Sequence, residues 1–360
     1  MGLKNFYRNK RVFITGHTGF KGSWLCEVLL NFGSIVGGYA LSPSDSNSEH
    51  ENLFDILRLS GRVKNYFADI RNLDSLKSAV KEFQPDIIIH MAAQPLVIDS
   101  YKRPAYTYEV NIMGTVNILE AARECESLKS FVNVTTDKVY LNREWVWGYR
   151  ENETLCGYDP YSNSKSCSEL VSYSYRNSFF SKKDSPAIST ARSGNVIGGG
   201  DFAENRIIPD CVRSALKHEN IILRNPDSIR PYQHVLECLH GYLLLAMKQF
   251  DNKELYEGSY NFGPDESSCV TTRELTEIFC SELNEGLNII IHDQANKYHE
   301  HEANILKLDC AKSKSVLGWR PEWNITQAVN EVVSWLKVYR GKGGIISYMD
   351  SKILDFYGVN

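Results

Sequence analysis

The chain has 360 residues, of which 42% are hydrophobic and 23% are charged. These values lie in the ordinary range for globular proteins, which excludes disordered, collagen-like and low-complexity chains. The formal net charge of −4 excludes nucleic-acid or membrane-surface binding as the main role. Because single cores rarely grow beyond about 250–300 residues, we expect one large domain with a smaller lobe built onto it.

The cysteines predict the cellular compartment. Nine are scattered along the chain without a CxxC pair, and neither this odd number nor the spacing indicates a disulfide framework or a zinc site. Reduced thiols are typical of cytosolic proteins. No apolar segment typical of a secretory signal precedes the first strand, and no run of about 18 apolar residues occurs. We therefore expect a soluble, cytoplasmic protein without a membrane partner and without a bound metal.

The first two thirds of the chain alternates short apolar runs with longer helical patterns, which is typical of βαβ units on a parallel sheet. A strand as apolar as Ile87-Ile88-Ile89 suits burial on both faces. We expect strands at Arg11–Thr15, Ile35–Ala40, Val63–Ala68, Asp86–His90, Ser130–Thr135 and Ala187–Ala191. We expect helices at Gly22–Phe32, Leu73–Glu82, Thr107–Glu124 and Ser162–Phe180.

The pattern loosens after about residue 195. Helical periodicity recurs at Ile208–Lys217, His234–Phe250, Thr272–Asn284 and Gln327–Val338. No Pro- or Ser-rich linker separates the two parts, which favours a second lobe that shares a cleft with the first. We predict a cofactor domain over residues 1–190, with later segments returning to it, and a mainly substrate-binding, smaller mixed α/β lobe over residues 191–360.

A glycine-rich segment, Gly16-His17-Thr18-Gly19-Phe20-Lys21-Gly22, follows the first strand and opens a helix. Glycines permit the tight turn and let backbone amides approach a pyrophosphate, which the helix N-terminus then stabilises. The strand before it and the helix after it make this motif far more specific than a lone glycine pattern. We predict a Rossmann-type, doubly wound parallel sheet in which all seven residues contact a dinucleotide.

Other cofactor contacts are expected where later strands end. The second strand ends without an acid for the ribose hydroxyls and without an Arg for a 2′-phosphate, so this site leaves NAD and NADP open. Ser42 is a weak substitute for the acid. The remaining candidates are Asp69 and Ile70 after the third strand, for the adenine edge, and Ala92, Ala93 and Gln94 after the fourth, where the cofactor passes.

A Tyr and a Lys four residues apart, Tyr161 and Lys165, lie on one face of the predicted helix. A free phenol titrates near about 10. A nearby cation favours the phenolate and makes Tyr161 a usable base near neutral pH. With Thr136 at the end of the fifth strand and the glycine motif, this spacing indicates a catalytic group.

Together these residues resemble the extended short-chain dehydrogenase/reductase family over nearly the whole chain. Thr136, Tyr161 and Lys165 match its catalytic trio, and Asn111 in Asn111-Ile112-Met113-Gly114-Thr115 matches its structural asparagine. The resemblance implies NAD as cofactor, held in part by Asn111, Tyr161 and Lys165. It also implies a homodimer that pairs through the helices at Thr107–Glu124 and Ser162–Phe180.

The segment Thr135-Thr136-Asp137-Lys138 narrows the resemblance to the nucleotide-sugar 4,6-dehydratases. In those enzymes the equivalent run is Thr-Asp-Glu, where Asp is the acid and Glu the base of water elimination. This sequence has Lys138 in place of the Glu, as does the CDP-glucose 4,6-dehydratase branch. Similarity to that branch extends to Asn142–Glu151, Asn195–Asp201, Arg230–Val235 and His301-Glu302-Ala303.

The resemblance implies a reaction on a CDP-hexose, in the synthesis of deoxysugars for lipopolysaccharide O-antigen. Tyr161 would start oxidation at C4, Asp137 would protonate the leaving 6-hydroxyl, and Lys138 would take the C5 proton or else only pair with Asp137 or a phosphate. We expect Arg230, Arg206, Asn195 and His301 to bind the nucleotide sugar. The alternatives are a nucleotide-sugar 4-epimerase, which needs no acid at C6, and a non-catalytic NAD-sensing regulator.

Overall fold

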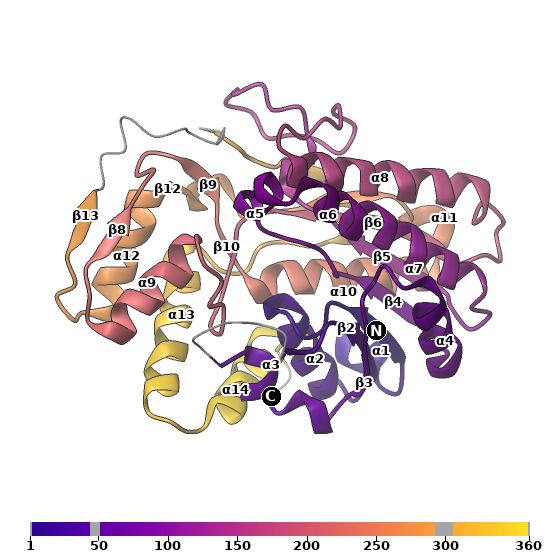
Figure 1. The fold of residues 1–360 in the computed structure, drawn as a ribbon, viewed down its shortest axis with the longest axis horizontal. Helices are drawn as coiled ribbons and strands as arrows, with labels where there is room; N and C mark the ends of the chain where they lie inside the picture. Colours follow the sequence, from indigo (N-terminus) through magenta and orange to yellow (C-terminus); the bar gives the residue numbers. More distant parts are fainter. Residues whose placement is uncertain (1, 44–50, 292–304, 359–360) are drawn as a thin grey trace.

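A seven-stranded parallel sheet forms the centre of the molecule. The computed structural model describes residues 2–43, 51–291 and 305–358 (Figure 1). The strand order is β11-β6-β5-β4-β1-β2-β3. Strands β2 and β3 are added on one side of β1 and the later strands on the other, so the strand order reverses between β1 and β4. The strands are β1 (Arg11–Thr15), β2 (Ile35–Ala40), β3 (Lys64–Phe67), β4 (Ile87–His90), β5 (Ser130–Val134), β6 (Ala187–Ser193) and β11 (Ser259–Phe262).

Both faces of the sheet are covered because consecutive strand residues, whose side chains point to opposite faces, are apolar. In β1, Val12 and Ile14 pack on one face and Phe13 packs on the other. Helices α4 (Leu73–Phe83), α7 (Gly114–Arg123) and α8 (Pro160–Ser178) supply side chains to the Phe13 face. The opposite face is covered by α1 (Leu3–Tyr7), α2 (Phe20–Asn31), α10 (Val235–Asp251) and α14 (Ile345–Phe356). This arrangement confirms the predicted doubly wound α/β fold.

The predicted strands and helices of the first two thirds are present, with ends that differ by a few residues. The strand β11, however, was not predicted, and it pairs in parallel with β6 at the edge of the sheet. Its sequence, Ser259-Tyr260-Asn261-Phe262, is short and half polar, so no apolar run marks it. The polar residue Asn261 is nevertheless fully buried, because partners from distant segments satisfy its side chain.

The helical segment predicted at Thr107–Glu124 is not one regular helix. It consists of α6 (Pro104–Tyr108), a π-helical turn η3 (Glu109–Met113) and α7. Such turns are rare and are frequently found at functional sites. The wider turn contains Asn111, whose buried side chain bonds to two other segments, as described below.

The smaller lobe has a core of its own, in which Ile208, Ile221, Leu275, Phe279 and Val329 are buried. Its strands are the parallel pair β8 (Ile221–Leu223) and β13 (Ile289–Ile291), the parallel pair β7 (Val196–Ile197) and β10 (Gln233–His234), and the antiparallel pair β9 (Ile229–Pro231) and β12 (Cys269–Thr271). Its helices are α9 (Ile207–Lys217), α12 (Thr272–Leu283) and α13 (Ile325–Arg340). Capping boxes begin both α12 and α13.

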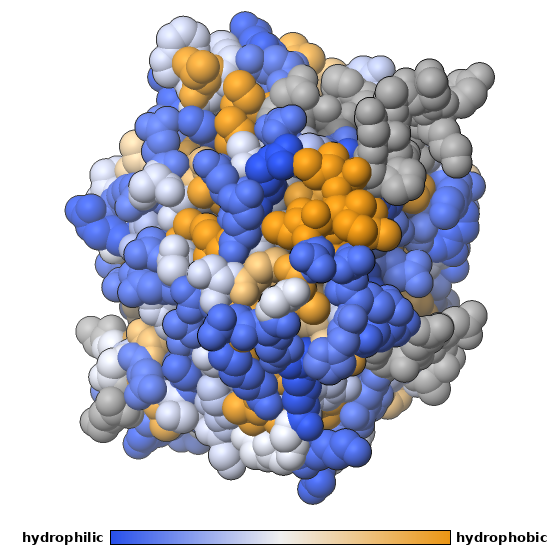
Figure 2. All heavy atoms as spheres, turned by 90° about the vertical axis from the view of Figure 1, so that its left-hand side faces the viewer, coloured by the Kyte–Doolittle hydropathy of each residue, from blue (hydrophilic) through white to orange (hydrophobic). Residues whose placement is uncertain are grey.

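The outer face of this lobe is mostly hydrophilic, with apolar patches between the charged groups (Figure 2). Ile222, Ile290 and Ile291, on the pair β8 and β13, are among its exposed apolar side chains. The described residues also form the short α-helices α3 (Leu53–Ile56), α5 (Val97–Lys102) and α11 (Lys253–Tyr256). Across the three described ranges, no helix is both long and apolar enough to span a lipid bilayer.

Candidate active site

The glycine loop lies at the point where the strand order reverses, and it contacts the loop after β4. Gly16 has φ of +77°, and a Cβ atom there would lie 2.8 Å from the backbone N of Ala92. A Cβ on Gly22 would lie 2.2 Å from the carbonyl oxygen of Gly16. Only glycine fits either position, so the turn is tight for the reason that the motif predicts.

The amides at the start of α2 are available to a ligand. Gly19 is the N-cap residue and offers no side chain to the first turn of the helix. A Cβ on Gly19 would meet only the Gly16 oxygen, at 3.5 Å. The loop is therefore packed tightly on the inside and open at its tip. Backbone donors at a helix N-terminus are suited to phosphate oxygens.

Two side chains of the loop point away from its open tip. His17 is buried, with Nε2 2.9 Å from Asn65 Oδ1, and it fills the space that Gly38 leaves empty on β2. Burial lowers the pKa of His17 to about 4, so the ring is neutral. Thr18 donates its hydroxyl to the carbonyl of Leu41 at 3.1 Å. At His17 and Thr18, therefore, the loop can contact a cofactor through its backbone rather than through its side chains.

Replacing Gly22 by Ala is expected to abolish dinucleotide binding and to lower the free energy of unfolding by about 1–3 kcal/mol. The added methyl group would collide with the Gly16 carbonyl and force the loop open. Gly61→Ala is the control, because Gly61 lies outside the loop and a Cβ atom there would meet nothing within 4 Å. Thermal unfolding and calorimetric titration with NAD measure both effects. Tight NAD binding by Gly22→Ala would contradict this role of the loop.

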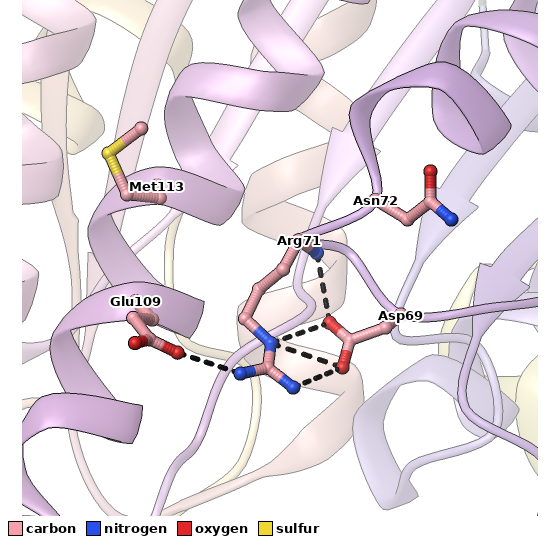
Figure 3. Close-up of a pocket in the computed structure, with 5 residues that line it drawn as sticks. All are labelled: Asp69, Arg71, Asn72, Glu109 and Met113. Carbon is pink, nitrogen blue, oxygen red and sulfur yellow. Dashed lines mark hydrogen bonds and ion pairs between the residues drawn. The ribbon is translucent and has the colours of Figure 1, made fainter.

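After β3, the edge strand of the sheet, the carboxylate of Asp69 forms an ion pair within the protein. Arg71 donates to both its oxygens, at 2.8 Å from Nη2 to Oδ2, and its other terminal nitrogen lies 2.7 Å from Glu109 (Figure 3). These residues, with Asn72 and Met113, line a shallow pocket. Ile70 is buried against Gly114. Ser42, the other predicted contact here, is half-buried just after β2.

The loop after β4 is held in place by the π turn. Asn111 accepts from the backbone N of Gln94 at 2.8 Å, and its amide donates to the Gln94 carbonyl and to Ser164 Oγ. The Gln94 side chain is turned inward to Leu96 and Thr107. Asn111 therefore links the loop Ala92–Gln94 to α8. Ala92 and Ala93 remain half-buried along the cofactor's expected path.

The end of β5 places three predicted residues together. Asp137 is fully buried, and its Oδ1 atom accepts from the Thr136 hydroxyl at 3.0 Å and from Lys138 Nζ at 2.9 Å. Lys138 Nζ is also 3.4 Å from Asn195 Oδ1. The second carboxylate oxygen, Oδ2, has no hydrogen-bond partner among the described residues. A Cβ atom on Gly194 would collide with Oδ2, so the backbone of Gly194 lies close to this oxygen.

Tyr161 and Lys165 project from α8, which begins at Asp159 and Pro160. Lys165 Nζ donates to the carbonyl of Val134 at 3.1 Å, so its ammonium is anchored to β5. Burial and the charge of Lys21 together lower the pKa of Lys165 to about 8. Burial raises the pKa of Tyr161 to about 12, against the opposite effects of Thr136 and the Arg206 charge. Lys165 is thus buried, and Tyr161 is half-buried beside Thr136.

Cations from both lobes surround Asp137. Lys21, at the start of α2, has its Nζ atom 5.8 Å from the ring centroid of Tyr242. Burial lowers the pKa of Lys21, and Arg206 and Lys138 are close enough to lower it too. Arg206, the N-cap residue of α9, lies 3.4 Å from Asp201. The structure therefore brings Lys21, Lys138, Lys165 and Arg206 to one place.

The structure describes two of the other three residues predicted to bind the substrate. Asn195 contacts Lys138, as described above. Arg230 is 5% exposed on β9, next to Pro231, and donates to the carbonyl of Ile229 at 2.9 Å. His301 lies outside the described residues.

A family model described as GDP-mannose 4,6 dehydratase matches residues 13–332. The chain belongs to this family of nucleotide-sugar dehydratases. A CDP-glucose 4,6-dehydratase of Salmonella typhimurium is 46% identical over 348 residues, which cover 95% of each chain. This degree of similarity confirms membership of the nucleotide-sugar dehydratases within the extended short-chain dehydrogenase/reductases.

Solved structures share the fold of this nucleotide-sugar dehydratase. A UDP-glucose 4-epimerase of Thermotoga maritima matches with a TM-score of 0.77 at 20% identity, covering 92% of this chain and 99% of that one. A dTDP-glucose 4,6-dehydratase of Bacillus anthracis, solved with NAD, matches with a TM-score of 0.73 at 21% identity, covering 92% and 97%. Both confirm the Rossmann-type architecture.

Sequence reasoning missed a buried ion pair in the dehydratase, that between Glu169 and Arg192. Their side chains are 1% and 2% exposed and 2.8 Å apart. The available signal was the spacing of Glu169, which follows Lys165 by one helical turn. Arg192 lies 23 residues further along the chain and gives no local signal.

Proposed function

We propose that the protein is an NAD-dependent hydro-lyase that converts CDP-glucose to CDP-4-keto-6-deoxyglucose. One observation carries the proposal: the buried Asp137, with Lys138 2.9 Å from it, lies at the same strand end as Thr136 and the pair Tyr161 and Lys165. An epimerase needs the latter pair but no acid–base pair beside it. The relative that is 46% identical is a CDP-glucose 4,6-dehydratase, which supports the same choice.

The residues present fit a dinucleotide. The loop Gly16–Gly22 is open at its tip, no side chain caps the first amides of α2, and Ala92 and Ala93 are small, half-buried residues in the neighbouring loop. We propose that this loop holds the pyrophosphate and that the end of β3 lies at the adenine. NAD, when bound, supplies the acceptor that takes hydride from C4 and returns it to C6.

In the first step, Tyr161 takes the proton of the sugar 4-hydroxyl. Its pKa of about 12 without ligand must fall for this, and the Thr136 hydroxyl and the Arg206 charge act in that direction. Because Lys165 is anchored to the Val134 carbonyl, its charge stays in place during the transfer. Lys165 is buried and Tyr161 is half-buried, which limits the access of water to the phenolate.

In the second step, water leaves from C5 and C6. The 4-ketone acidifies the C5 proton, Lys138 as a neutral amine takes it, and Asp137 as a neutral acid protonates the leaving hydroxyl. The ionic pair and this neutral pair differ only in the position of one proton across the 2.9 Å contact. The reactive form therefore needs no proton from solvent, and the pair is ionic again after water departs. Lys138 then returns a proton to C5 as hydride reaches C6.

We propose that residues 1–190 bind the cofactor and that residues 191–360 supply most contacts to the nucleotide. The cations Arg206 and Arg230 suit a diphosphate, and Asn195 lies beside the acid–base pair. His301 remains a predicted contact of the nucleotide.

Incubation of the protein and NAD with CDP-, dTDP-, UDP- and GDP-hexoses, each separately, tests the substrate. We expect the absorbance of a 4-keto sugar in alkali to appear with CDP-glucose. Turnover of another nucleotide alone would contradict the CDP assignment. Conversion of a hexose to its C4 epimer would favour the epimerase, and NAD binding without any turnover would favour a sensor.

We propose that the protein is a homodimer that pairs through α7 and α8, which lie side by side in Figure 1. Leu170 and Tyr173, one turn apart on α8, are 53% and 60% exposed, and Met113 is exposed on the neighbouring turn. The double variant Leu170→Glu/Tyr173→Glu is expected to be monomeric, as measured by light scattering after size exclusion. Leu255→Glu, at another exposed apolar position, is the control. A dimer that survives the double variant would contradict this interface.

We also propose that the protein acts in the cytoplasm. All nine cysteines are free thiols, and five of them are buried. Free thiols persist in the reducing cytosol. The proposed product is a precursor for deoxysugars, for which lipopolysaccharide O-antigen is the predicted destination.

A further inference from the structure

Glu169 is a buried acid that none of the proposed steps uses. Its Oε1 atom accepts from Thr135 Oγ1 at 2.5 Å and from Arg192 Nε at 2.9 Å. Its Oε2 atom accepts from Thr190 Oγ1 at 2.6 Å and from Arg192 Nη2 at 2.8 Å. The carboxylate of α8 is thus bonded to β6 and to the residue after β5, with donors on both oxygens.

The network continues beyond Arg192. The remaining nitrogen of its guanidinium, Nη1, donates to the Tyr140 hydroxyl at 2.8 Å and to the carbonyl of Glu151 at 3.0 Å. Tyr140 in turn donates to Asn261 on β11 at 2.7 Å. The network therefore joins α8 to β6, to β11, to the residue after β5 and to the segment that follows the acid–base pair.

Stability alone gives little reason for this pair, since buried ion pairs commonly contribute no more than well-packed apolar residues of similar volume. Its place is more informative. Thr135, which bonds to Glu169, directly precedes Thr136. Lys165, one turn before Glu169 on α8, is anchored to Val134 on β5. The carboxylate thus bridges the two elements that carry the proposed base and its helpers.

We propose that Glu169 is a positioning residue of the catalytic centre: by joining α8 to the ends of β5 and β6, it fixes the Lys165 ammonium relative to the Thr136 hydroxyl. This inference rests on the proposed function. It assigns a role in catalysis to a residue that does not contact substrate.

The negative charge of Glu169 has a measurable effect on the pKa of Lys165. The titratable groups that act on Lys165 are Lys21 of α2 and Glu169 on its own helix, and His90 of β4 is close enough to feel its charge. Burial and the charge of Lys21 lower the pKa of Lys165 to about 8, against the opposite effect of the negative charge of Glu169. His90 is neutral, because burial and the Lys165 charge lower its pKa to about 3. Loss of the Glu169 charge should therefore let Lys165 lose its proton at lower pH.

The variant Glu169→Gln keeps the shape of the side chain and removes its charge. Lysine labelled with ¹³C at the ε carbon allows NMR titration of Lys165 in the full chain, with its signal assigned by Lys165→Met. We expect the Lys165 midpoint to move down by about one pH unit. The alkaline limb of kcat/KM with CDP-glucose should move with it.

Glu27→Gln is the matched control. Glu27 is also fully buried and accepts from both terminal nitrogens of an arginine, Arg62, at 2.7 Å, but it lies on α2. We expect this variant to lose stability without a shift of the Lys165 midpoint. An unchanged Lys165 midpoint in Glu169→Gln would overturn the proposal. If the wild type turns over no nucleotide hexose, the proposed function fails, while the NMR titration still decides whether Glu169 sets the state of Lys165.

Should Glu169→Gln fail to fold, Thr135→Val carries the test. It removes the single hydrogen bond between the residue after β5 and the carboxylate and leaves the ion pair intact. We expect kcat to fall about tenfold with KM within twofold of the wild type, because orientation at the reacting atoms is lost while substrate binding is retained. Unchanged kcat, or a rise in KM alone, would overturn the positioning role.

Discussion

Tyr161→Phe is expected to lower kcat by about 100- to 10,000-fold, the range that general acid–base groups contribute. The variant loses only the phenolic oxygen, which takes the proton of the 4-hydroxyl in the proposed first step. Lys165 and Thr136 remain, but neither is placed to do this instead: Lys165 is anchored to the Val134 carbonyl, and Thr136 donates to Asp137. Binding of NAD and of CDP-glucose should be nearly unchanged.

Steady-state kinetics with CDP-glucose and calorimetric titration with NAD measure the two effects separately. Tyr158→Phe is the control, because Tyr158 is 74% exposed three residues earlier in the chain. We expect it to retain wild-type kcat. A Tyr161→Phe variant within tenfold of the wild type would show that another group takes the proton.

Lys138→Met is expected to lower the rate of deuterium incorporation at C5 by about 100-fold or more when the reaction is run in D₂O. Methionine has a similar length and no basic nitrogen, so the C5 proton of the 4-keto intermediate has no acceptor. Asp137 also loses the partner 2.9 Å away, which leaves its carboxyl without the proton exchange described above. Overall turnover should fall in parallel.

Proton NMR of the recovered nucleotide sugar measures deuterium at C5. Lys64→Met, which removes an exposed lysine paired with Glu82, controls for the loss of an ion pair elsewhere. Unchanged incorporation at C5 would mean that Lys138 only pairs with Asp137 or with a phosphate, and another base would have to be sought.

The sheet could be predicted because its strands are marked by local composition. Ile87-Ile88-Ile89 is apolar on both faces of its strand. In β1, likewise, Phe13 packs on one face of the sheet and its two apolar neighbours pack on the other. β11 was not predicted, because its polar residue Asn261 can be buried only when its side chain is hydrogen-bonded to Tyr140, to the Tyr149 carbonyl and to the Asp309 carbonyl. Such compensation depends on contacts between segments that are far apart in the sequence.

In the candidate site, too, some features could be predicted from local sequence and others depend on tertiary contacts. Tyr161 and Lys165 have a helical spacing, and Asp137 and Lys138 are adjacent, so the sequence alone could group them. Where a side chain points is set by tertiary contacts. His17 belongs to the glycine motif, yet its ring turns to Asn65 because Gly38 leaves space there. Likewise, no local pattern indicates that Asn195 would lie 3.4 Å from Lys138.

The central claim is that oxidation at C4 and reduction at C6 are two halves of one reaction in this protein. CDP-glucose that carries deuterium at C4 tests it most directly. We predict that the product is the 4-keto-6-deoxy sugar and that the deuterium from C4 is recovered at C6 of the same molecule. Recovery of the deuterium at C4 of an epimerised hexose, with the 6-hydroxyl retained, would contradict the account.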